Sequence, residues 1–246
     1  MFDYIPPPAL LAKRIILVTG AGDGIGRAAA KSFAAHGATV ILLGRTTSKL
    51  EAVYDEIEQA GHPQPAIYPM NFEGASPNDY EDLANTLETE FGRLDGLLHN
   101  ASLLGTLTPI EHYDIEQWFQ VIQVNQNAPF LLTQACLSLM KSAPEASIVF
   151  TSSSVGRKGR AYWGAYSVSK FAIEGLMQIL ADELEANTAI RVNSINPGAT
   201  RTAMRAAAYP GEDQKSLPAP EDIMPLYLYL MGPESRELNG QALNAQ

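Results

Sequence analysis

The sequence predicts an α/β fold in which seven parallel strands form one sheet that helices cover on both faces. Short apolar runs alternate with longer amphipathic stretches from residue 15 almost to the end of the 246-residue chain. The runs are continuously apolar, which is typical of parallel strands buried on both faces. The length suits one α/β domain with a sizeable core. We therefore expect a single doubly wound domain spanning residues 1–246.

The expected strands are short and rich in Ile, Leu and Val. In chain order they are IILVTG from Ile15, TVILLGR from Thr39, AIYPMNF from Ala66, DGLLHNA from Asp95, SIVFTSS from Ser147, RVNSINPG from Arg191 and QALNAQ from Gln241. Helical patterns lie between them, as in GRAAAKSFAAHG, PNDYEDLANTLETEFG and FAIEGLMQILADELEAN. One long stretch, residues 200–222, lacks clear periodicity and follows the carboxyl end of a strand, where such sheets bind ligands. We interpret it as a short substrate lid with helical content near 204–208; a plain surface connection is the alternative.

Charge and composition exclude several classes of function. The net charge of −10 disfavours binding to nucleic acid and to anionic membranes. No apolar run approaches the roughly 18 residues of a membrane span, and the first residues, MFDYIPPPALLAKR, lack the pattern of a signal peptide. We therefore expect a cytoplasmic protein. Cys136 lies in an apolar helical pattern and should be buried, and the four histidines lack ligand spacing, so we expect no metal site.

A glycine string, TGAGDGIG at Thr19–Gly26, closes the first expected strand and opens the first helix. Glycines there permit a tight turn and the close approach of a pyrophosphate to N–H groups at a helix N-terminus. A tight turn without a ligand is the alternative, but the string begins the first βα unit of the chain. The pattern predicts a Rossmann-type dinucleotide site at Gly20, Asp23, Gly24, Ile25 and Gly26.

Tyr166 and Lys170 lie four residues apart in YSVSK, and on a helix they would share one face. An adjacent ammonium favours the phenolate and lowers the pKa of the phenol, so that Tyr166 could exchange a proton near neutral pH. The pair alone is weak evidence, because such spacings also arise by chance. The order Asn125, Ser153, Tyr166 and Lys170 downstream of the glycine string is much stronger evidence.

The spacing TGxxxGxG combined with Tyr-x-x-x-Lys resembles the short-chain dehydrogenase/reductase family over essentially the whole chain, and most closely its YciK-like bacterial oxidoreductases. The resemblance implies that Tyr166 is the catalytic acid/base. It also implies that Lys170 lowers the pKa of Tyr166 and binds the nicotinamide ribose. Ser153 would hydrogen-bond the substrate oxygen, although the neighbouring serines leave the register uncertain by one residue. Asn125 would hold a water in a proton relay behind Lys170.

The resemblance also implies contacts to the cofactor. The stretch INPGATRT matches the family pattern PGxxxT, which places Pro197, Gly198 and Thr202 at the nicotinamide end and gives Thr200 a backbone contact to the carboxamide.

Two family positions depart from the pattern. The family's NNAG is HNAS here, so Asn100 and Ala101 match but Ser102 replaces a glycine. Asn71 replaces the acidic residue that contacts the adenine; its amide can still accept a hydrogen bond. His99 is interpreted as a packed strand residue.

The end of the second expected strand indicates the choice of cofactor. NAD-selective sites place an acid there, whereas the 2′-phosphate of NADP favours Arg. This strand ends in Gly44-Arg45, so NADP(H) is favoured over NAD(H). Asp23 in the glycine string argues the other way, and Arg45 could be only a solvated charge.

We therefore predict an NADP(H)-dependent oxidoreductase that moves a hydride between nicotinamide and a carbonyl or secondary alcohol. A 3-oxoacyl-thioester reductase and a non-catalytic NADP(H)-binding sensor or scaffold are the alternatives. The expected partner is a small-molecule substrate, and the resemblance implies a homodimer or homotetramer built on the helices that contain Asn125 and Tyr166.

Two expectations concern the substrate. Leu103, Leu104, Tyr162, Trp163 and Met204 could form an apolar, partly aromatic pocket, or simply belong to the core. A second group, Arg157, Lys158 and Arg160, could attract anionic substrates, although a solvated loop is the favoured interpretation of those charges.

Overall fold

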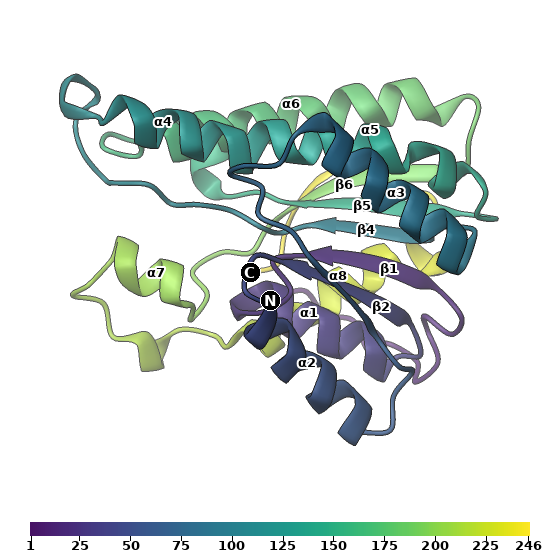
Figure 1. The fold of residues 1–246 in the computed structure, drawn as a ribbon. Coiled ribbons are helices and arrows are strands. Elements are labelled where there is room, and N and C mark those ends of the chain that lie inside the picture. The colour runs from purple at the N-terminus through teal and green to yellow at the C-terminus, as the bar shows by residue number, and fades with distance from the viewer.

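The computed structural model describes residues 1–246 and confirms the predicted sheet (Figure 1). Seven strands pair in parallel in the order β3-β2-β1-β4-β5-β6-β7. Their bounds are β1 Ile15–Thr19, β2 Thr39–Gly44, β3 Ala66–Pro69, β4 Gly96–His99, β5 Ala146–Thr151, β6 Ile190–Asn196 and β7 Ala242–Asn244. All seven expected strands are therefore present; each ends earlier than expected, and β5 and β6 each begin one residue earlier.

Helices cover both faces of the sheet. The α-helices are α1 Gly24–Ala35, α2 Thr47–Gln59, α3 Pro77–Phe91, α4 Ile115–Ile122, α5 Ala128–Lys141, α6 Gly164–Glu185, α7 Ala203–Ala208 and α8 Met224–Met231. Shorter helical turns are η1 Ile110–His112, the π-helical η2 Gln123–Asn127, η3 Ser154–Gly156, η4 Gln214–Ser216, η5 Pro220–Ile223 and η6 Pro233–Ser235. Figure 1 shows α3, α4, α5 and α6 on one face of the sheet and α1, α2 and α8 on the other.

Each face of the sheet has its own hydrophobic core. Ile16 and Val18 of β1 belong to the core under α1 and α8, whereas Leu17 belongs to the core under α3, α5 and α6. Side chains of successive strand residues point to opposite faces, so a strand that serves two cores must be apolar throughout. Cys136 is fully buried in the second core, as expected.

The strand order places a ligand site at one edge of the sheet. The chain runs outward from β1 to β3, returns to β4 beside β1, and then runs outward on the other side. Parallel sheets bind ligands at the carboxyl ends of the strands where the order reverses, which is here between β1 and β4. The predicted helix near 204–208 is confirmed as α7, which lies beyond these strand ends (Figure 1). No helix combines the length and apolarity that a membrane span requires.

Candidate active site

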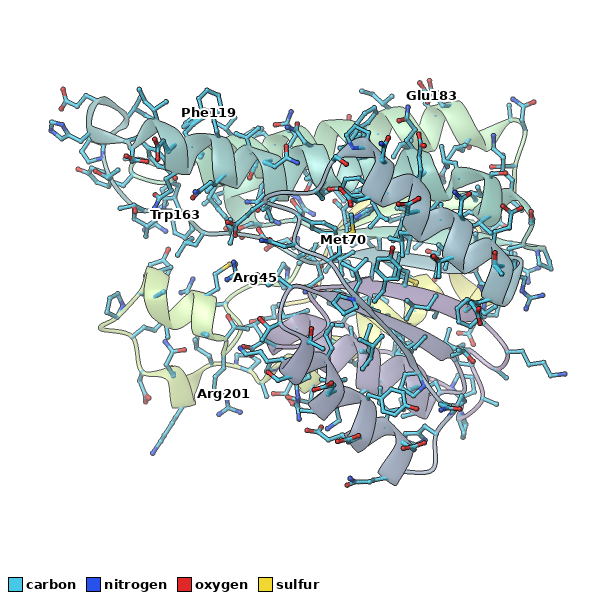
Figure 2. All side chains as sticks on the ribbon, in the orientation of Figure 1. Arg45, Met70, Phe119, Trp163, Glu183 and Arg201 are labelled. Atoms are coloured by element: carbon cyan, nitrogen blue, oxygen red, sulfur yellow. The ribbon has the colours of Figure 1, made fainter.

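A cavity of about 500 Å³ opens at the carboxyl ends of the strands, between the glycine turn, the end of β2, the β5–α6 connection and α7. Fifteen of the seventeen predicted site residues line it: Gly20, Asp23, Gly24, Ile25, Arg45, Asn71, Asn100, Ala101, Ser153, Tyr166, Lys170, Pro197, Gly198, Thr200 and Thr202. Gly26 and Asn125 lie outside the lining. Figure 2 shows Arg45 and Trp163, both lining residues, at this end of the sheet.

The turn between β1 and α1 depends on its glycines. Gly20 and Gly24 have φ angles of +68° and +50°, which favour glycine. A Cβ at Gly26 would lie 2.2 Å from the Gly20 carbonyl oxygen, so a side chain there would displace the turn. Asp23 caps α1 by accepting the Gly24 N–H at 2.8 Å. The glycine cradle at the start of this 12-residue helix fits a pyrophosphate, because its backbone can approach the ligand closely.

Thr19 joins this turn to the end of β4. Its Oγ1 accepts the N–H groups of Asn100 and Ala101 at 2.9 and 3.0 Å and donates to the Leu98 carbonyl at 3.2 Å. A Cβ at Gly20 would lie 3.0 Å from the Ala101 Cα, so glycine also permits this close approach. The predicted residues Asn100 and Ala101 thus form the cavity wall opposite the glycine turn.

The end of β2 carries two ion pairs. Arg45 binds Glu73 with 2.8 Å between Nη1 and Oε1, and Lys49 binds Asp23 with 2.5 Å between Nζ and Oδ2. The hydrogen bond from Lys49 is the main reason that the pKa of Asp23 lies below its usual value. The negative charge of Asp23, which argued against a 2′-phosphate, is therefore paired with Lys49, just as the charge of Arg45 is paired with Glu73. The sequence reading missed Lys49 and Glu73, which both line the cavity.

Tyr166 and Lys170 lie on the first two turns of α6 and are only 8% and 4% exposed. The Lys170 ammonium donates to the Thr151 carbonyl at 2.7 Å and lies 5.5 Å from the centre of the Tyr166 ring. Burial raises the pKa of Tyr166 to about 12, against the effect of a hydrogen bond from Ser153. Burial also lowers the pKa of Lys170 to about 8, against the attraction of Glu174.

These directions correct one expectation. The sequence predicted that Lys170 would lower the pKa of Tyr166, but the dominant influence on the phenol is its burial. The phenol is therefore protonated at pH 7 and the lysine is charged. A protonated phenol carries the proton that a general acid needs.

The three serines that follow β5 differ in their surroundings. Ser153 caps η3 by accepting the Val155 N–H at 3.4 Å, and it hydrogen-bonds the Tyr166 hydroxyl. Ser154 is exposed and does not line the cavity. Ser152 does line it, with a buried hydroxyl that has no partner. Of the three, Ser153 is the one that lowers the pKa of Tyr166, and its contact to the substrate oxygen stays a prediction.

Asn125 lies in the π-helix η2 and is 1% exposed. Its Oδ1 accepts the Leu103 N–H at 2.7 Å, and its Nδ2 donates to the Leu103 carbonyl at 2.8 Å and to Ser169 Oγ at 3.0 Å. The amide therefore ties the cavity wall at Leu103 to α6. These bonds use both amide protons and one lone pair of Oδ1, and the relay water expected at Asn125 stays a prediction.

The expected apolar pocket is largely present. Leu103, Leu104, Trp163 and Met204 line the cavity. Tyr162 does not: its φ of +75° accompanies a side chain that is 60% exposed.

Trp163 lies between Tyr166 and the segment that follows α7. Its ring centre lies 5.7 Å from that of Tyr166 and 5.9 Å from that of Tyr209, which directly follows α7. Arg205 stacks 3.7 Å over the Tyr209 ring and makes two hydrogen bonds of 2.6 Å to Glu212. These contacts hold α7 over the aromatic side of the cavity.

Two of the three basic residues between Ser153 and Tyr166 are already paired. Arg157 donates to Glu174 at 3.1 Å, and Arg160 donates to the Tyr209 hydroxyl at 2.7 Å. Only Lys158 is exposed without an ion pair or side-chain hydrogen bond. This finding weakens the interpretation of the segment as an attractor of anionic substrates.

His99 packs in the sheet, as interpreted from the sequence. Its ring stacks on Phe150 with 4.7 Å between centres, and Nε2 lies 2.8 Å from Thr133 Oγ1. Burial lowers the pKa of His99 to about 3, so the ring is neutral. No group of three His, Cys, Asp or Glu side chains is arranged to hold a metal ion.

A doubly wound parallel sheet whose glycine turn and buried Tyr-Lys pair open into one cavity is typical of dinucleotide-dependent oxidoreductases. The sequence model of the short chain dehydrogenases matches residues 14–213, and the chain belongs to this family of oxidoreductases. It is 52% identical to the oxidoreductase YciK of Escherichia coli over 243 residues, covering 99% of this chain and 96% of YciK.

Two solved structures are similar over nearly their whole length. A short chain dehydrogenase from Pseudomonas syringae is 64% identical and has a TM-score of 0.98, with 100% of both chains covered. A short chain dehydrogenase from Shigella flexneri, complexed with NADP, is 52% identical and has a TM-score of 0.95, covering 98% of this chain and 100% of that one.

Proposed function

We propose that the protein is an NADP(H)-dependent oxidoreductase that transfers a hydride between nicotinamide and a carbonyl or secondary alcohol carbon. The observation that carries the proposal is that Ser153, Tyr166 and Lys170 share one cavity with the glycine turn. The dinucleotide would supply or accept the hydride. The choice of NADP(H) is supported by Arg45 and Lys49 at the end of β2 and by the Shigella flexneri relative complexed with NADP.

The cofactor would lie along the carboxyl ends of the strands. The N-terminus of α1 would receive the pyrophosphate, because the glycines let the backbone approach the ligand closely and the helix dipole favours an anion. Arg45 and Lys49 would exchange their carboxylate partners for the 2′-phosphate. The contacts expected at Asn71, Asn100, Ala101, Pro197, Gly198, Thr200 and Thr202 are part of the same proposal, as these residues all line the cavity.

Side chains of the protein would orient the substrate and transfer the proton. In the reductive direction Ser153 would orient the carbonyl oxygen, and Tyr166 would protonate the developing alkoxide. The nearby charge of Lys170 would stabilise the phenolate that remains. In the oxidative direction the phenol must first lose its proton, which its raised pKa opposes. We therefore expect carbonyl reduction to be the faster direction at neutral pH.

The decisive experiment is a screen of carbonyl compounds with NADPH, followed by absorbance, that includes ketones, aldehydes and 3-oxoacyl thioesters. Reduction of a simple ketone or aldehyde would support the proposal, and a response to thioesters alone would indicate the narrower 3-oxoacyl reductase. Tight NADPH binding without turnover of any compound would favour a sensor or scaffold. The buried Tyr-Lys pair argues against the sensor, because a binder needs no buried charge beside a phenol.

We also propose that a second copy of the chain covers the outer face of α4, α5 and α6. Large apolar side chains on these helices are 45–71% exposed: Ile115, Phe119, Phe130, Val168, Phe171 and Ile179. Figure 2 shows Phe119 on the outer side of α4. Light scattering should give at least twice the 26.6 kDa mass of the chain, and Phe119→Glu with Phe171→Glu should reduce it to the monomer.

A further inference from the structure

A buried carboxylate lies one helical turn beyond the proposed catalytic pair. Tyr166, Lys170 and Glu174 follow one another at intervals of four residues on α6 and are 8%, 4% and 7% exposed. The reaction proposed above gives Glu174 no role. A buried carboxylate is costly to maintain without paired groups, so its partners indicate what it does.

Two donors hold the Glu174 carboxylate. Arg157 Nε donates to Oε1 at 3.1 Å, and Ser194 Oγ donates to Oε2 at 2.7 Å. Arg157 also donates to Asn244 Oδ1 at 2.8 Å and to the Leu243 carbonyl at 2.9 Å. The carboxylate is therefore fixed between α6, β6 and a cation that is itself anchored on β7.

Lys170 makes no direct ion pair with Glu174, since its ammonium donates to the Thr151 carbonyl at 2.7 Å. The two charges act on each other through the protein interior. Gly156 keeps this part of the molecule compact: a Cβ there would lie 2.8 Å from the Lys170 Cβ. Because η3 approaches α6 so closely, Arg157, which directly follows Gly156, lies within hydrogen-bond distance of Glu174.

Building on the proposed function, we propose that Glu174, fixed by Arg157 and Ser194, is a positioning residue that keeps the ammonium charge of Lys170 beside Tyr166. Burial alone pushes Lys170 toward its neutral form, and Glu174 is the carboxylate that opposes this effect. Without the charge on Lys170, the phenolate left after proton donation would lose the protein cation that lies 5.5 Å from the centre of its ring. Glu174 thus acts through Lys170 and never touches the substrate.

The other titratable groups around Lys170 do not supply a negative charge near neutral pH. Tyr166 on the same helix has a pKa raised to about 12. Tyr227 of α8 reaches the same Thr151, with 3.5 Å between the two hydroxyl oxygens, and burial raises its pKa above the ordinary value. Arg157, beyond η3, is a cation that competes for Glu174. The charge of Lys170 therefore depends on the balance between Glu174 and Arg157.

This balance predicts shifts of opposite sign. Glu174→Gln removes the attraction and should lower the pKa of Lys170 by about one unit or more. Arg157→Gln removes a competing cation and should raise it. We would follow the side-chain carbon signals of selectively labelled lysine by NMR during a pH titration of the ligand-free protein. Lys170→Met identifies the Lys170 signal.

Two matched variants control for simple loss of charge. Lys158→Gln removes a positive charge from the residue next to Arg157, and Glu183→Gln removes a negative charge from the exposed far end of α6 (Figure 2). Neither should move the titration of Lys170. In active enzyme, the alkaline limb of kcat/KM for reduction should move with the Lys170 titration in both test variants.

The proposal is overturned if Lys170 titrates unchanged in Glu174→Gln, even if activity falls. If Glu174→Gln fails to fold, Arg157→Gln provides the test. A raised pKa of Lys170 in that variant supports the proposal, and an unchanged pKa of Lys170 overturns it. The NMR titration needs neither cofactor nor substrate. An inactive enzyme with the predicted shifts would contradict the proposed function and leave the charge balance standing.

Discussion

The two ends of the cavity are built in different ways. At the α6 end, Tyr166 and Lys170 are less than 10% exposed, and the ammonium of Lys170 is fixed on a backbone carbonyl. At the β2 end, the side chains of Arg45, Lys49 and Asp23 are 55–62% exposed, and each is held in an ion pair with another side chain. Burial tunes the first set by whole pKa units, whereas exposed ion pairs contribute at most about 1 kcal/mol.

The difference separates two tasks. A group that moves a proton must have a fixed position and a defined pKa. Burial provides both, because a buried side chain has few other positions or hydrogen-bond partners available. A group that selects a ligand by charge must release its resting partner when the ligand arrives, and a weak exposed pair does so at little cost. We therefore expect changes at the α6 end to affect turnover and changes at the β2 end to affect affinity.

The largest effect is expected for Tyr166→Phe. The ring and its packing remain but the acidic proton is lost, so turnover should fall by about 10²- to 10⁴-fold with NADPH affinity nearly unchanged. Tyr162→Phe, four residues earlier with its side chain exposed, is the matched control and should keep parental turnover. Steady-state rates and an NADPH fluorescence titration measure the two quantities. Turnover within a few-fold of the parent would remove Tyr166 from the mechanism.

At the other end, Arg45→Ala should act on binding. A charge-assisted hydrogen bond contributes about 1.5–3 kcal/mol, so NADPH affinity should fall roughly 10- to 150-fold while NADH affinity stays the same. Lys49→Ala should act in the same direction, since its ammonium faces the same part of the cavity. Equal losses for NADPH and NADH would mean that these side chains only support the loop. Tighter binding of NADH by the parent protein would contradict the choice of NADP(H).

The pH dependence of reduction should report the buried end. Lys170 has its pKa lowered to about 8, so the ammonium is present below that pH and is lost above it. Tyr166 stays protonated through this range, because its pKa is about 12. The rate of reduction should therefore be nearly flat up to about pH 8 and then fall, by up to about tenfold per pH unit. In Lys170→Arg the cation does not titrate in this range, so the fall in rate above pH 8 should disappear. If the rate of this variant still falls at the same pH, another group causes the fall.

The sequence predicted what depends on local pattern. Continuous apolar runs identified the seven strands, and the spacing within TGAGDGIG and YSVSK identified the glycine turn and the Tyr-Lys pair. These features are encoded by residues close in the chain. The interpretation of Arg45 used the same kind of information, because a strand end has a known place in such a sheet.

What the sequence left out depends on pairing across the fold. The partnership of Arg45 with Glu73 joins residues 28 positions apart, and that of Arg157 with Leu243 joins residues 86 apart. No local pattern identifies such partners. The direction of the Tyr166 pKa was wrong because only the neighbouring lysine was considered, whereas burial is set by the whole fold. Tyr162 was wrongly placed in the pocket, since its positive φ could not be read from composition.

The smallest effect is expected at Ser102, which follows β4 in the wall of the cavity. Ser102 replaces a family glycine and lines the cavity, and its hydroxyl oxygen is buried without a partner. An unsatisfied buried hydroxyl costs about 1–3 kcal/mol, so Ser102→Ala should stabilise the ligand-free protein and raise its Tm by about 2–4 °C per kcal/mol. If the hydroxyl bonds the cofactor, the same change should weaken NADPH binding by about 2- to 12-fold. Ser154→Ala, which removes an exposed hydroxyl outside the cavity, should change neither quantity. A higher Tm with unchanged NADPH affinity would show that the Ser102 hydroxyl has no role in binding. A higher Tm with weaker NADPH binding would mean that this hydroxyl lacks a partner in the ligand-free protein because it hydrogen-bonds the cofactor.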